Sequence, residues 1–470
     1  MKLPLSRNRL LTAALLAILT ITAATQNGTK PTSVCPDCIR HNLEYLAGPE
    51  LHGRGSGTED EHRAAQYIAE QLKSYGLKPA AENGEYIQTA NISTRNVTGT
   101  PALTFNKGTG GSTQQVSFSQ GKEFALVTAP AEPDVSAPLQ KLDLNEASAS
   151  PASVKAGAAL LMKLRPDNGT VEKVIGSYMQ SKAAILILPM DANDGIFRQI
   201  LHRGPRARRR LGNEATGPNL VLITNDAAEQ MWSLADGATI KLHADLTPWE
   251  TTRTWNVLGK IEGRNLRQLI LLSAHLDHLG VRDGKTYPGA DDDGSGTVAV
   301  MELARALAKQ PQPQRTLVFA LWGSEEVGLI GARYFLQNPT FDLKDVVANL
   351  EFEMIARADP KVKPNELWLT GWERTNLGPE LAAHGAQLVG DPHPDQSFFT
   401  RSDNFALARK GIIAQTVSSY GLHKDYHQPT DTVDKVDWQH LDSAVGSMIA
   451  PISWLANSDF VPAWNAGMKP

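Results

Sequence analysis

Unbroken apolar runs, each followed by polar residues, dominate the second half of the chain. Residues 268–276, 316–322, 346–352 and 411–417 are such runs, and residues 298–308 have the apolar spacing of a helix. Strands of a parallel sheet are continuously apolar because helices cover both faces of the sheet. The alternation of strand, loop and helix therefore predicts a doubly wound α/β sheet with helices on both faces.

The first half of the chain has a different texture. Residues 39–46 and 58–75 carry apolar side chains at helical spacing, and the Gly-rich stretch 48–57 separates them. From residue 97 to residue 249, short β-like runs alternate with loops rich in Gly, Pro, Ser and Asp. Residues 226–232 predict one helix within this block. We interpret the block as a β-rich domain inserted into the α/β fold.

The N-terminus has the pattern of an export signal. Lys2, Arg7 and Arg9 precede the apolar run 10–24, and small residues follow it. This order predicts a signal peptide over residues 1–25 and a secreted or periplasmic protein. A membrane span needs about 20 apolar residues, so an uncleaved anchor is the alternative reading of this run. No span is expected after removal of the signal.

Cysteine content and charge narrow the class of protein. Only 2 of the 470 residues are Cys, which excludes a disulfide-built scaffold. After export, Cys35 and Cys38 would form a small disulfide clip or remain thiols, with a redox pair or half a metal site as alternatives. The net charge of −4 argues against a nucleic-acid-binding protein. The stretch RGPRARRR at 203–210 is interpreted as a solvated loop, with a partner-binding or processing site as the alternative.

Metal-capable side chains follow the apolar runs. In open α/β sheets, ligands bind beyond the carboxyl ends of the strands, so these side chains are expected to converge. Alone, each cluster is commonly a surface pair, a helix cap or a solvated rim; their order and placement together favour a metal site. The residues are His275, Asp277, His278, Asp291, Asp292, Asp293, Glu325, Glu326, Glu351, Glu353, His423 and His427.

These clusters carry a family resemblance. The series AHLDH, GADDDGSG, GSEEVGLIGARYF, NLEFEM and DYHQPTDT resembles the secreted dizinc exopeptidases, which include bacterial leucyl aminopeptidase, aminopeptidase Y and the glutamate carboxypeptidases. The resemblance covers residues 39–95 and 253–455. It implies a three-layer αβα sandwich with a mixed, largely parallel sheet. The catalytic domain would comprise residues 26–96 and 252–470, interrupted by a protease-associated-like insert at 97–251.

The resemblance also implies a set of ligands for two Zn²⁺ ions. By motif position, Asp292 would bridge the two ions. His275 and Glu353 would complete the protein ligands of one ion, and Glu326 and His427 those of the other. Imidazole and carboxylate ligands suit zinc, and two neighbouring metals need one shared carboxylate.

Further roles follow from motif position. Glu325 matches the general base, and Asp277 matches the carboxylate that orients His275. Asp431 would orient His427 in the same way, and a cis peptide bond is expected after Asp292. Family members commonly have Asp where this chain has Glu353.

Glu351 competes with Glu353 for the ligand role. It lies two residues earlier and would share a face of the strand with Glu353. Glu353 is preferred because it aligns with the family position before Met354.

The implied function is a zinc-dependent exopeptidase, an aminopeptidase that uses a metal-activated water and a Glu base on peptide substrates. A carboxypeptidase or dipeptidase would bind a terminal carboxylate through Arg357 or Arg401, which could equally form structural salt bridges. A glutaminyl cyclase or an inactive binding relative are further alternatives. Residues 393–405 could wall the specificity pocket, although Phe398 and Phe399 could equally be core.

Overall fold

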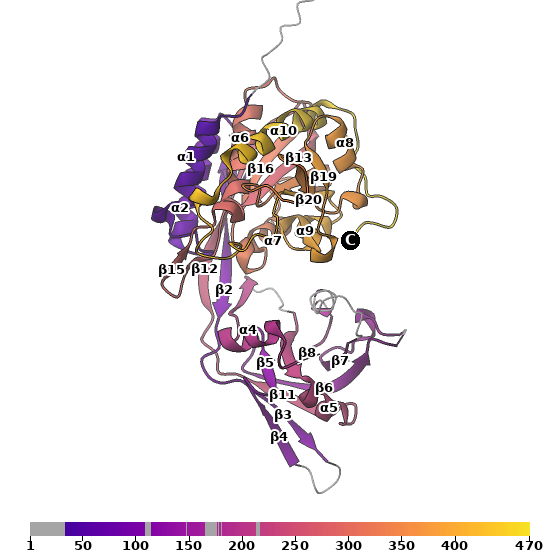
Figure 1. The fold of residues 1–470 in the computed structure, drawn as a ribbon. Coiled ribbons are helices and arrows are strands. Elements are labelled where there is room, and N and C mark those ends of the chain that lie inside the picture. The colour runs from indigo at the N-terminus through magenta and orange to yellow at the C-terminus, as the bar shows by residue number, and fades with distance from the viewer. Residues whose placement is uncertain are drawn as a thin grey trace, which may run out of the picture.

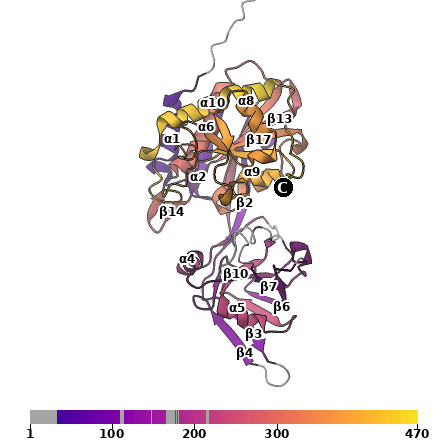
Figure 2. The same ribbon diagram turned by 45° about the vertical axis from the view of Figure 1, so that its right-hand side comes forward.

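The chain has a mixed α/β fold with two large sheets in separate lobes (Figures 1 and 2). The computed structural model describes residues 33–108, 114–146, 148–164, 176, 178–179, 181–212 and 217–470. The signal peptide expected at 1–25 lies outside the described residues. Within the described part of the chain, no helix is long and apolar enough to cross a bilayer.

The larger sheet has ten strands in the order β19-β18-β20-β17-β13-β16-β12-β2-β9, with β1 paired to β12. Only its centre, β20-β17-β13-β16, and the pair β18-β19 are parallel. The other five pairings are antiparallel, so the expectation of a largely parallel sheet holds for the centre alone. The strands are β1 (Lys78–Pro79), β2 (Ile87–Arg95), β9 (Arg208–Leu211), β12 (Glu250–Ile261), β13 (Asn265–His275), β16 (Arg315–Trp322), β17 (Val346–Phe352), β18 (Leu367–Leu369), β19 (Leu388–Gly390) and β20 (Ala414–Ser418).

Alternate side chains of the central strands enter two hydrophobic clusters. In β13, Ile270 and Leu272 join one cluster, whereas Leu269 and Leu271 join the other, because successive side chains point to opposite faces. The first cluster includes residues of α1 (Pro36–Leu46), α2 (Glu59–Ser74), α6 (Gly296–Leu307), α8 (Leu377–Ala383) and α10 (Trp438–Asn457). The second includes residues of α7 (Ile330–Gln337) and α9 (Asp403–Ala408).

The second sheet has eight strands in the order β4-β3-β11-β6-β7-β8-β10-β5 and carries hydrophobic clusters of its own. All of its strands lie within the predicted insert. However, β9 of the same segment pairs with β2 in the larger sheet, so the insert is tied to the other lobe. Its elements are β3 (Ala102–Lys107), β4 (Gln114–Ser119), β5 (Phe124–Leu126), β6 (Asp134–Asp143), β7 (Ala159–Lys163), β8 (Ile185–Met190), β10 (Asn219–Thr224), β11 (Thr239–His243), α4 (Gly195–Arg203) and α5 (Asn225–Trp232).

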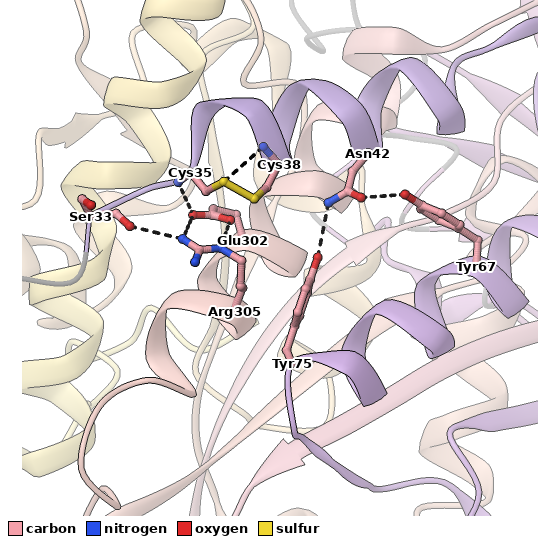
Figure 3. The surroundings of a disulfide bond; sticks show 8 residues. All are labelled: Ser33, Cys35, Cys38, Asn42, Tyr67, Tyr75, Glu302 and Arg305. Atoms are coloured by element: carbon pink, nitrogen blue, oxygen red, sulfur yellow. Dashed lines mark hydrogen bonds and ion pairs between the residues drawn. A yellow bond between two sulfur atoms is a disulfide. The ribbon is translucent and has the colours of Figure 1, made fainter.

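The predicted cysteine clip is confirmed at the start of α1 (Figure 3). Cys35 and Cys38 form a disulfide, and the backbone N–H of Cys38 donates to the Cys35 sulfur at 3.3 Å. The backbone N–H of Cys35 donates to Oε1 of Glu302 on α6 at 2.7 Å, and Arg305 donates to the same carboxylate. The disulfide therefore caps α1 where that helix meets α6.

Candidate metal centre

Three neighbouring parallel strands end at one edge of the larger sheet. His275 is the last residue of β13 and lies opposite Trp322, the last residue of β16. The turn Glu325–Val327 follows β16, and Glu353 directly follows β17. The strand register thus brings polar side chains from distant parts of the sequence to the same edge, as the pattern of apolar runs predicted.

The acidic loop Ala290–Ser295 closes this edge from the helix side. It contains the expected cis peptide bond between Asp292 and Asp293. The Asp293 carboxylate accepts hydrogen bonds at 3.1 Å from the backbone N–H groups of His275, Gly296 and Met354. These bonds tie the loop to β13, to α6 and to the residues after β17, and they fix the position of Asp292.

Gly289 is required just before this loop. Its φ is +62°, a conformation that favours glycine. A Cβ atom there would come within 2.5 Å of the His278 ring and 2.3 Å of the Asp292 carbonyl oxygen. The loop can approach His278 this closely only because position 289 has no side chain.

His275, Asp292 and Glu353 form one candidate ligand group. One ligand atom from each lies within 4.8 Å of the others, and His275 Nε2 lies 3.4 Å from Asp292 Oδ1. Burial raises the pKa of Glu353 to about 7, with a further contribution from Glu351 that the imidazole of His275 opposes. A bound cation would favour the carboxylate form that burial disfavours.

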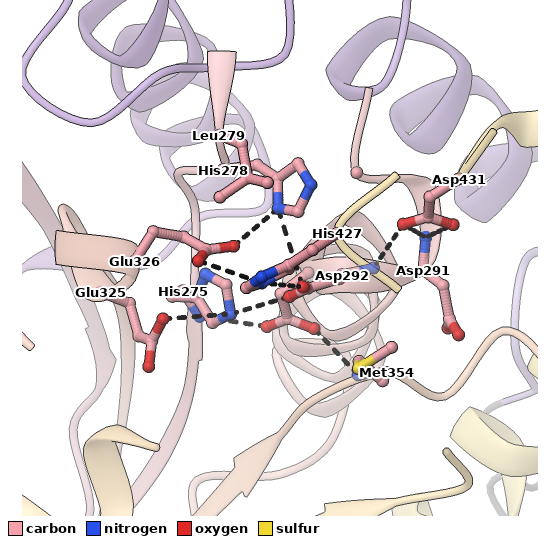
Figure 4. A network of polar contacts seen from close by, with 12 residues as sticks. His275, His278, Leu279, Asp291, Asp292, Glu325, Glu326, Met354, His427 and Asp431 are labelled. Atoms are coloured by element: carbon pink, nitrogen blue, oxygen red, sulfur yellow. Dashed lines mark hydrogen bonds and ion pairs between the residues drawn. The ribbon is translucent and has the colours of Figure 1, made fainter. Parts of the chain in front are cut away.

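His278, Asp292 and Glu326 form a second candidate group with the same central aspartate (Figure 4). His278 Nδ1 lies 2.8 Å from Glu326 Oε1. His427 Nε2 lies 3.1 Å from both Asp292 Oδ2 and Glu326 Oε2. Two imidazoles therefore face the same carboxylate pair. The sequence prediction assigned only His427 to this group.

The charges of the second group depend on one another. Burial lowers the pKa of His427, but its hydrogen bonds to Asp292 and Glu326 outweigh this and raise it to about 10. Burial and Asp292 raise the pKa of Glu326, but His278 and His427 lower it to about 2. Burial also raises the pKa of Asp292, and the three histidines around it lower that pKa well below its usual range.

Glu325 faces a different direction from its neighbour Glu326. Its Oε2 lies 4.0 Å from His275 Nε2, at the edge of the first ligand group. Burial raises the pKa of Glu325 well above its ordinary value; the nearby carboxylate of Glu326 adds to this, while His275 opposes it. A carboxyl group with a raised pKa beside candidate ligands suits proton transfer.

Asp277 supports both His275 and Glu325. The backbone carbonyl of Asp277 lies 3.2 Å from His275 Nδ1, and its carboxylate lies 3.8 Å from the same nitrogen. Its Oδ1 accepts from the Glu325 backbone N–H at 2.9 Å, and its Oδ2 accepts from Ser56 Oγ at 2.5 Å. Asp277 therefore lies where the sequence placed it, beside the first histidine.

The donor set fits zinc. Buried atoms of the two groups have no hydrogen-bond partner among the described residues, although several lie in ion-pair contact. The set of mixed imidazole nitrogens and carboxylate oxygens is typical of zinc sites. These atoms are His275 Nε2, His278 Nδ1, His278 Nε2, Asp292 Oδ2 and Glu326 Oε1.

Asp431 has partners other than the one expected. It accepts hydrogen bonds from the backbone N–H groups of Asp291 and Asp292 at 3.1 Å, and from Arg357 at 3.0 Å. The expectation that Asp431 orients His427 is therefore wrong. Asp431 instead holds the acidic loop, because its carboxylate accepts hydrogen bonds from two successive backbone N–H groups of that loop.

Glu351 and Arg357 have structural roles. Glu351 accepts hydrogen bonds from Ser402 at 3.1 Å and from the Asn404 backbone N–H at 2.5 Å, and it belongs to neither candidate ligand group. Arg357 donates to Asp425 at 2.8 Å and to Asp431 at 3.0 Å. Arg357 therefore forms structural salt bridges, which is one of the two roles considered for it from the sequence.

An aromatic pocket of about 40 Å³ lies beside Glu353. Phe398 stacks on Trp368 at 5.3 Å in its wall, and Arg401 lies over the Phe398 ring at 5.0 Å. Tyr426, which stacks on His427 at 4.0 Å, also lines this pocket. Phe399, in contrast, is buried in a hydrophobic cluster of the sheet. Only part of the segment 393–405 therefore faces the pocket.

Arg54 was not recognised from the sequence. It is buried, and its guanidinium donates to the carbonyl oxygens of Leu46, Leu276, Pro288 and Gly289. These contacts join α1, the end of β13 and the start of the acidic loop. The sequence does show a basic residue within the Gly-rich stretch 48–57. An arginine in a Gly-rich loop is usually exposed to solvent, so its burial was not expected.

Comparisons with known proteins give consistent family and fold assignments. Residues 256–451 match the family described as Peptidase family M28. The probable lipoprotein aminopeptidase LpqL of Mycobacterium tuberculosis (strain ATCC 25618 / H37Rv) is 28% identical over 254 residues, which are 46% of this chain and 48% of that protein. The chain thus spans about half the length of the curated relatives it matches.

Two solved structures share the fold. One is the aminopeptidase from Aneurinibacillus sp. strain AM-1, with a TM-score of 0.56 and 19% identity, covering 94% of this chain and 97% of that one. The other is BSAP, a zinc aminopeptidase from Bacillus subtilis, with a TM-score of 0.51 and 18% identity, covering 91% and 97%. Together with the family match, these likenesses agree with the resemblance of the sequence motifs. Residues 256–451 of this chain, which carry the candidate metal ligands, are the part that matches peptidase family M28.

Proposed function

We propose that the chain is a zinc-dependent aminopeptidase that removes N-terminal residues from peptides. One observation carries this proposal: three strand ends, the acidic loop and the segment at His427 all meet around the Asp292 carboxylate. A carboxylate shared by two groups of imidazole and carboxylate donors suits a pair of metal ions. The names of the relatives and of the structural neighbours support aminopeptidase activity.

Two zinc ions would be held by this arrangement. His275 and Glu353 would hold one ion, Glu326 and His427 the other, and Asp292 would bridge them. His278 is a further candidate at the second position. When bound, zinc polarises a scissile carbonyl and acidifies water.

Glu325 is the proposed base. It would accept the proton of the attacking water and later deliver it to the leaving amine. The Asp277 carboxylate holds the Glu325 backbone through its N–H, so it positions the base as well as His275. Because the Glu325 backbone is held at the edge of the first ligand group, its carboxylate could accept and deliver the proton without a movement of the backbone.

The aromatic pocket supports an exopeptidase with a side-chain preference. Glu353 lines both the metal centre and this pocket, so a residue seated there would place its peptide bond near the metals. Arg357, which could have held a terminal carboxylate in a carboxypeptidase, is committed to Asp425 and Asp431. This commitment removes Arg357 from the carboxypeptidase alternative, which then rests on Arg401 in the wall of the aromatic pocket.

The rest of the organisation is proposed with the function. A signal peptide at 1–25 would direct the protein to a secreted or periplasmic location. The catalytic domain would comprise residues 26–96 and 252–470 as a three-layer αβα sandwich, with a protease-associated-like insert at 97–251. The presence of His275 argues against a glutaminyl cyclase. The presence of Glu325 together with all the proposed ligands argues against an inactive relative.

Two blocked peptides test the direction of cleavage. The zinc-loaded protein is incubated with one peptide acetylated at its N-terminus and with the same sequence amidated at its C-terminus. We predict that residues are removed one after another from the amidated peptide and that the acetylated peptide is not cleaved. Mass spectrometry of the products measures both reactions. Cleavage of the acetylated peptide alone would show a carboxypeptidase instead.

A further inference from the structure

An arginine-lined cavity of about 440 Å³ is lined by residues of both lobes. Residues 206–210 of the insert line one side, and residues 326–328 with Arg333 line the other. The two sides are held together because β9 pairs with β2 of the larger sheet and contacts α7. The cavity therefore belongs to both lobes and reaches the candidate metal ligand Glu326.

Two of the arginines have structural partners. Arg208 is buried and donates to the Ala129 carbonyl and to Asn219 Oδ1 at 2.8 Å. Arg210 lies over the Trp249 ring at 4.1 Å. These contacts anchor the basic stretch to the insert and make it part of a built wall, in contrast to the solvated loop that the sequence indicated.

Two other arginines of the wall, Arg206 and Arg209, are exposed. Within the described part of the chain, no carboxylate forms an ion pair with either of them. The pKa of Arg209 is lowered by the surrounding protein and by the cations of Arg282 and Arg206. Burial is the larger cause of this shift, and the nearby like charges add to it, so an anion bound here would offset both.

Among the described residues that line the cavity, Glu326 supplies the only carboxylate, and it faces His278 and His427. As a metal ligand it would be neutralised by the ion. Guanidinium groups bind carboxylates through paired hydrogen bonds, so an incoming carboxylate fits this wall.

The two cavities diverge from the metal centre. Glu353 of the first ligand group lines the aromatic pocket, and Glu326 of the second lines the arginine cavity. Both groups share Asp292. A peptide with its N-terminal side chain in the aromatic pocket would cross the shared carboxylate and continue toward the arginines.

We propose that the arginine cavity binds a carboxylate on the leaving part of the peptide, so that peptides with an acidic group after the scissile bond are preferred substrates. This inference rests on the proposed aminopeptidase function. The carboxylate has two possible sources with the same chemistry, an Asp or Glu side chain or the free C-terminus of a short peptide.

Three tetrapeptides separate these sources. Leu-Ala-Glu-Ala-amide carries only a side-chain carboxylate, Leu-Ala-Gln-Ala with a free C-terminus carries only a terminal one, and Leu-Ala-Gln-Ala-amide carries neither. We expect kcat/KM for one or both of the acidic peptides to exceed that of the neutral peptide by about tenfold, chiefly through KM, because charged hydrogen bonds stabilise the complex. The preference should shrink in 0.5 M salt.

The matched variants are the double substitution Arg206→Gln with Arg209→Gln, and Arg267→Gln as a control on an exposed arginine of β13. The double variant should reduce the preference to below about twofold, whereas the control should retain it. Leucyl 4-nitroanilide, which has no carboxylate, reports the metal centre independently.

The outcomes are distinguishable. Hydrolysis of the anilide with equal rates on all three peptides overturns the cavity proposal and leaves the proposed function standing. Preference retained in the double variant also overturns it, because the carboxylate would then bind elsewhere. Failure to hydrolyse the anilide and every peptide contradicts the proposed function itself. The comparison of the three peptides on the unsubstituted protein needs no variant. It therefore tests the preference for acidic peptides even if the double variant folds poorly.

Discussion

The carboxylate of Asp277 accepts a hydrogen bond from the backbone N–H of Glu325 at 2.9 Å. Asp277 follows the end of β13 and Glu325 follows the end of β16, so the bond joins two neighbouring strand ends. The same carboxylate lies 3.8 Å from His275 Nδ1. The Asp277 backbone carbonyl, 3.2 Å from the same nitrogen, contacts the proposed metal ligand directly, so one buried residue positions that ligand and the proposed base together.

Asp277→Asn should weaken zinc binding by about 10- to 100-fold, because an amide supports the His275 ring less well than a carboxylate does. Competition with a chromophoric chelator measures the affinity. Asp226→Asn, at an exposed position of α5, is the control and should bind zinc normally. Unchanged affinity in Asp277→Asn would remove Asp277 from the zinc site.

Glu325→Gln should retain zinc and lose about 100- to 10,000-fold in kcat, because the amide cannot accept the proton of the attacking water. Metal content by mass spectrometry and kcat on leucyl 4-nitroanilide are measured on the same sample. Glu44→Gln, an exposed residue of α1, should behave as the parent. Near-normal turnover in Glu325→Gln would show that the base is another group.

Zinc binding should release about two protons from the histidines at pH 7 and part of a further proton from Glu353, whose pKa burial raises to about 7, since neutral imidazole and carboxylate are the forms that bind a metal. In the metal-free protein the pKa of His427 is raised to about 10 by Asp292 and Glu326 against the effect of burial. Burial lowers the pKa of His275, but Asp293 and Glu325 outweigh it and raise that pKa well above its ordinary value.

The sign of the pH dependence follows from this release. Both rings carry a proton at pH 7, so zinc must displace it, and affinity should increase as the pH rises from 6 toward 9. Calorimetric titrations in two buffers with different ionisation enthalpies count the protons. Equal heats in both buffers would contradict protonated histidines in the metal-free site.

Arg54→Met should lower the free energy of unfolding by about 3 kcal/mol or more, because four carbonyl oxygens, three of them in buried hydrogen bonds, lose their donor. The loss should also loosen the acidic loop and weaken zinc binding. Urea unfolding of the metal-free protein measures the first effect. Arg267→Met on the exposed part of β13 is the control, and an equal, small change in both variants would deny Arg54 this role.

The sequence was sufficient where the chain is periodic. The apolar run 346–352 coincides with β17, and the run 316–322 lies within β16. Parallel neighbours end at one edge, so the meeting of His275 with Glu326 and Glu353 could be expected from strand ends and motif order. The assigned roles of these residues stay predictions.

Other features depend on three-dimensional contacts that have no periodic signal. The outer strands β18 and β19 have three residues each, too few to show a pattern, which is why the antiparallel pairing of β18 with β20 was not expected. His278 could not be ranked against His427, because only the closed loop at Gly289 brings His278 to Glu326. Likewise, the sequence did not show that β9 pairs with β2. This pairing places the basic stretch in the wall of a cavity, where a solvated loop had been expected.

The central claim is that two zinc ions bound around Asp292 are required for aminopeptidase activity. Protein stripped with a chelator and titrated with Zn²⁺ tests it most directly, with leucyl 4-nitroanilide hydrolysis followed at each addition. We predict no activity without metal and recovery that is complete at two equivalents of zinc per chain. Full activity in the metal-free protein would contradict it.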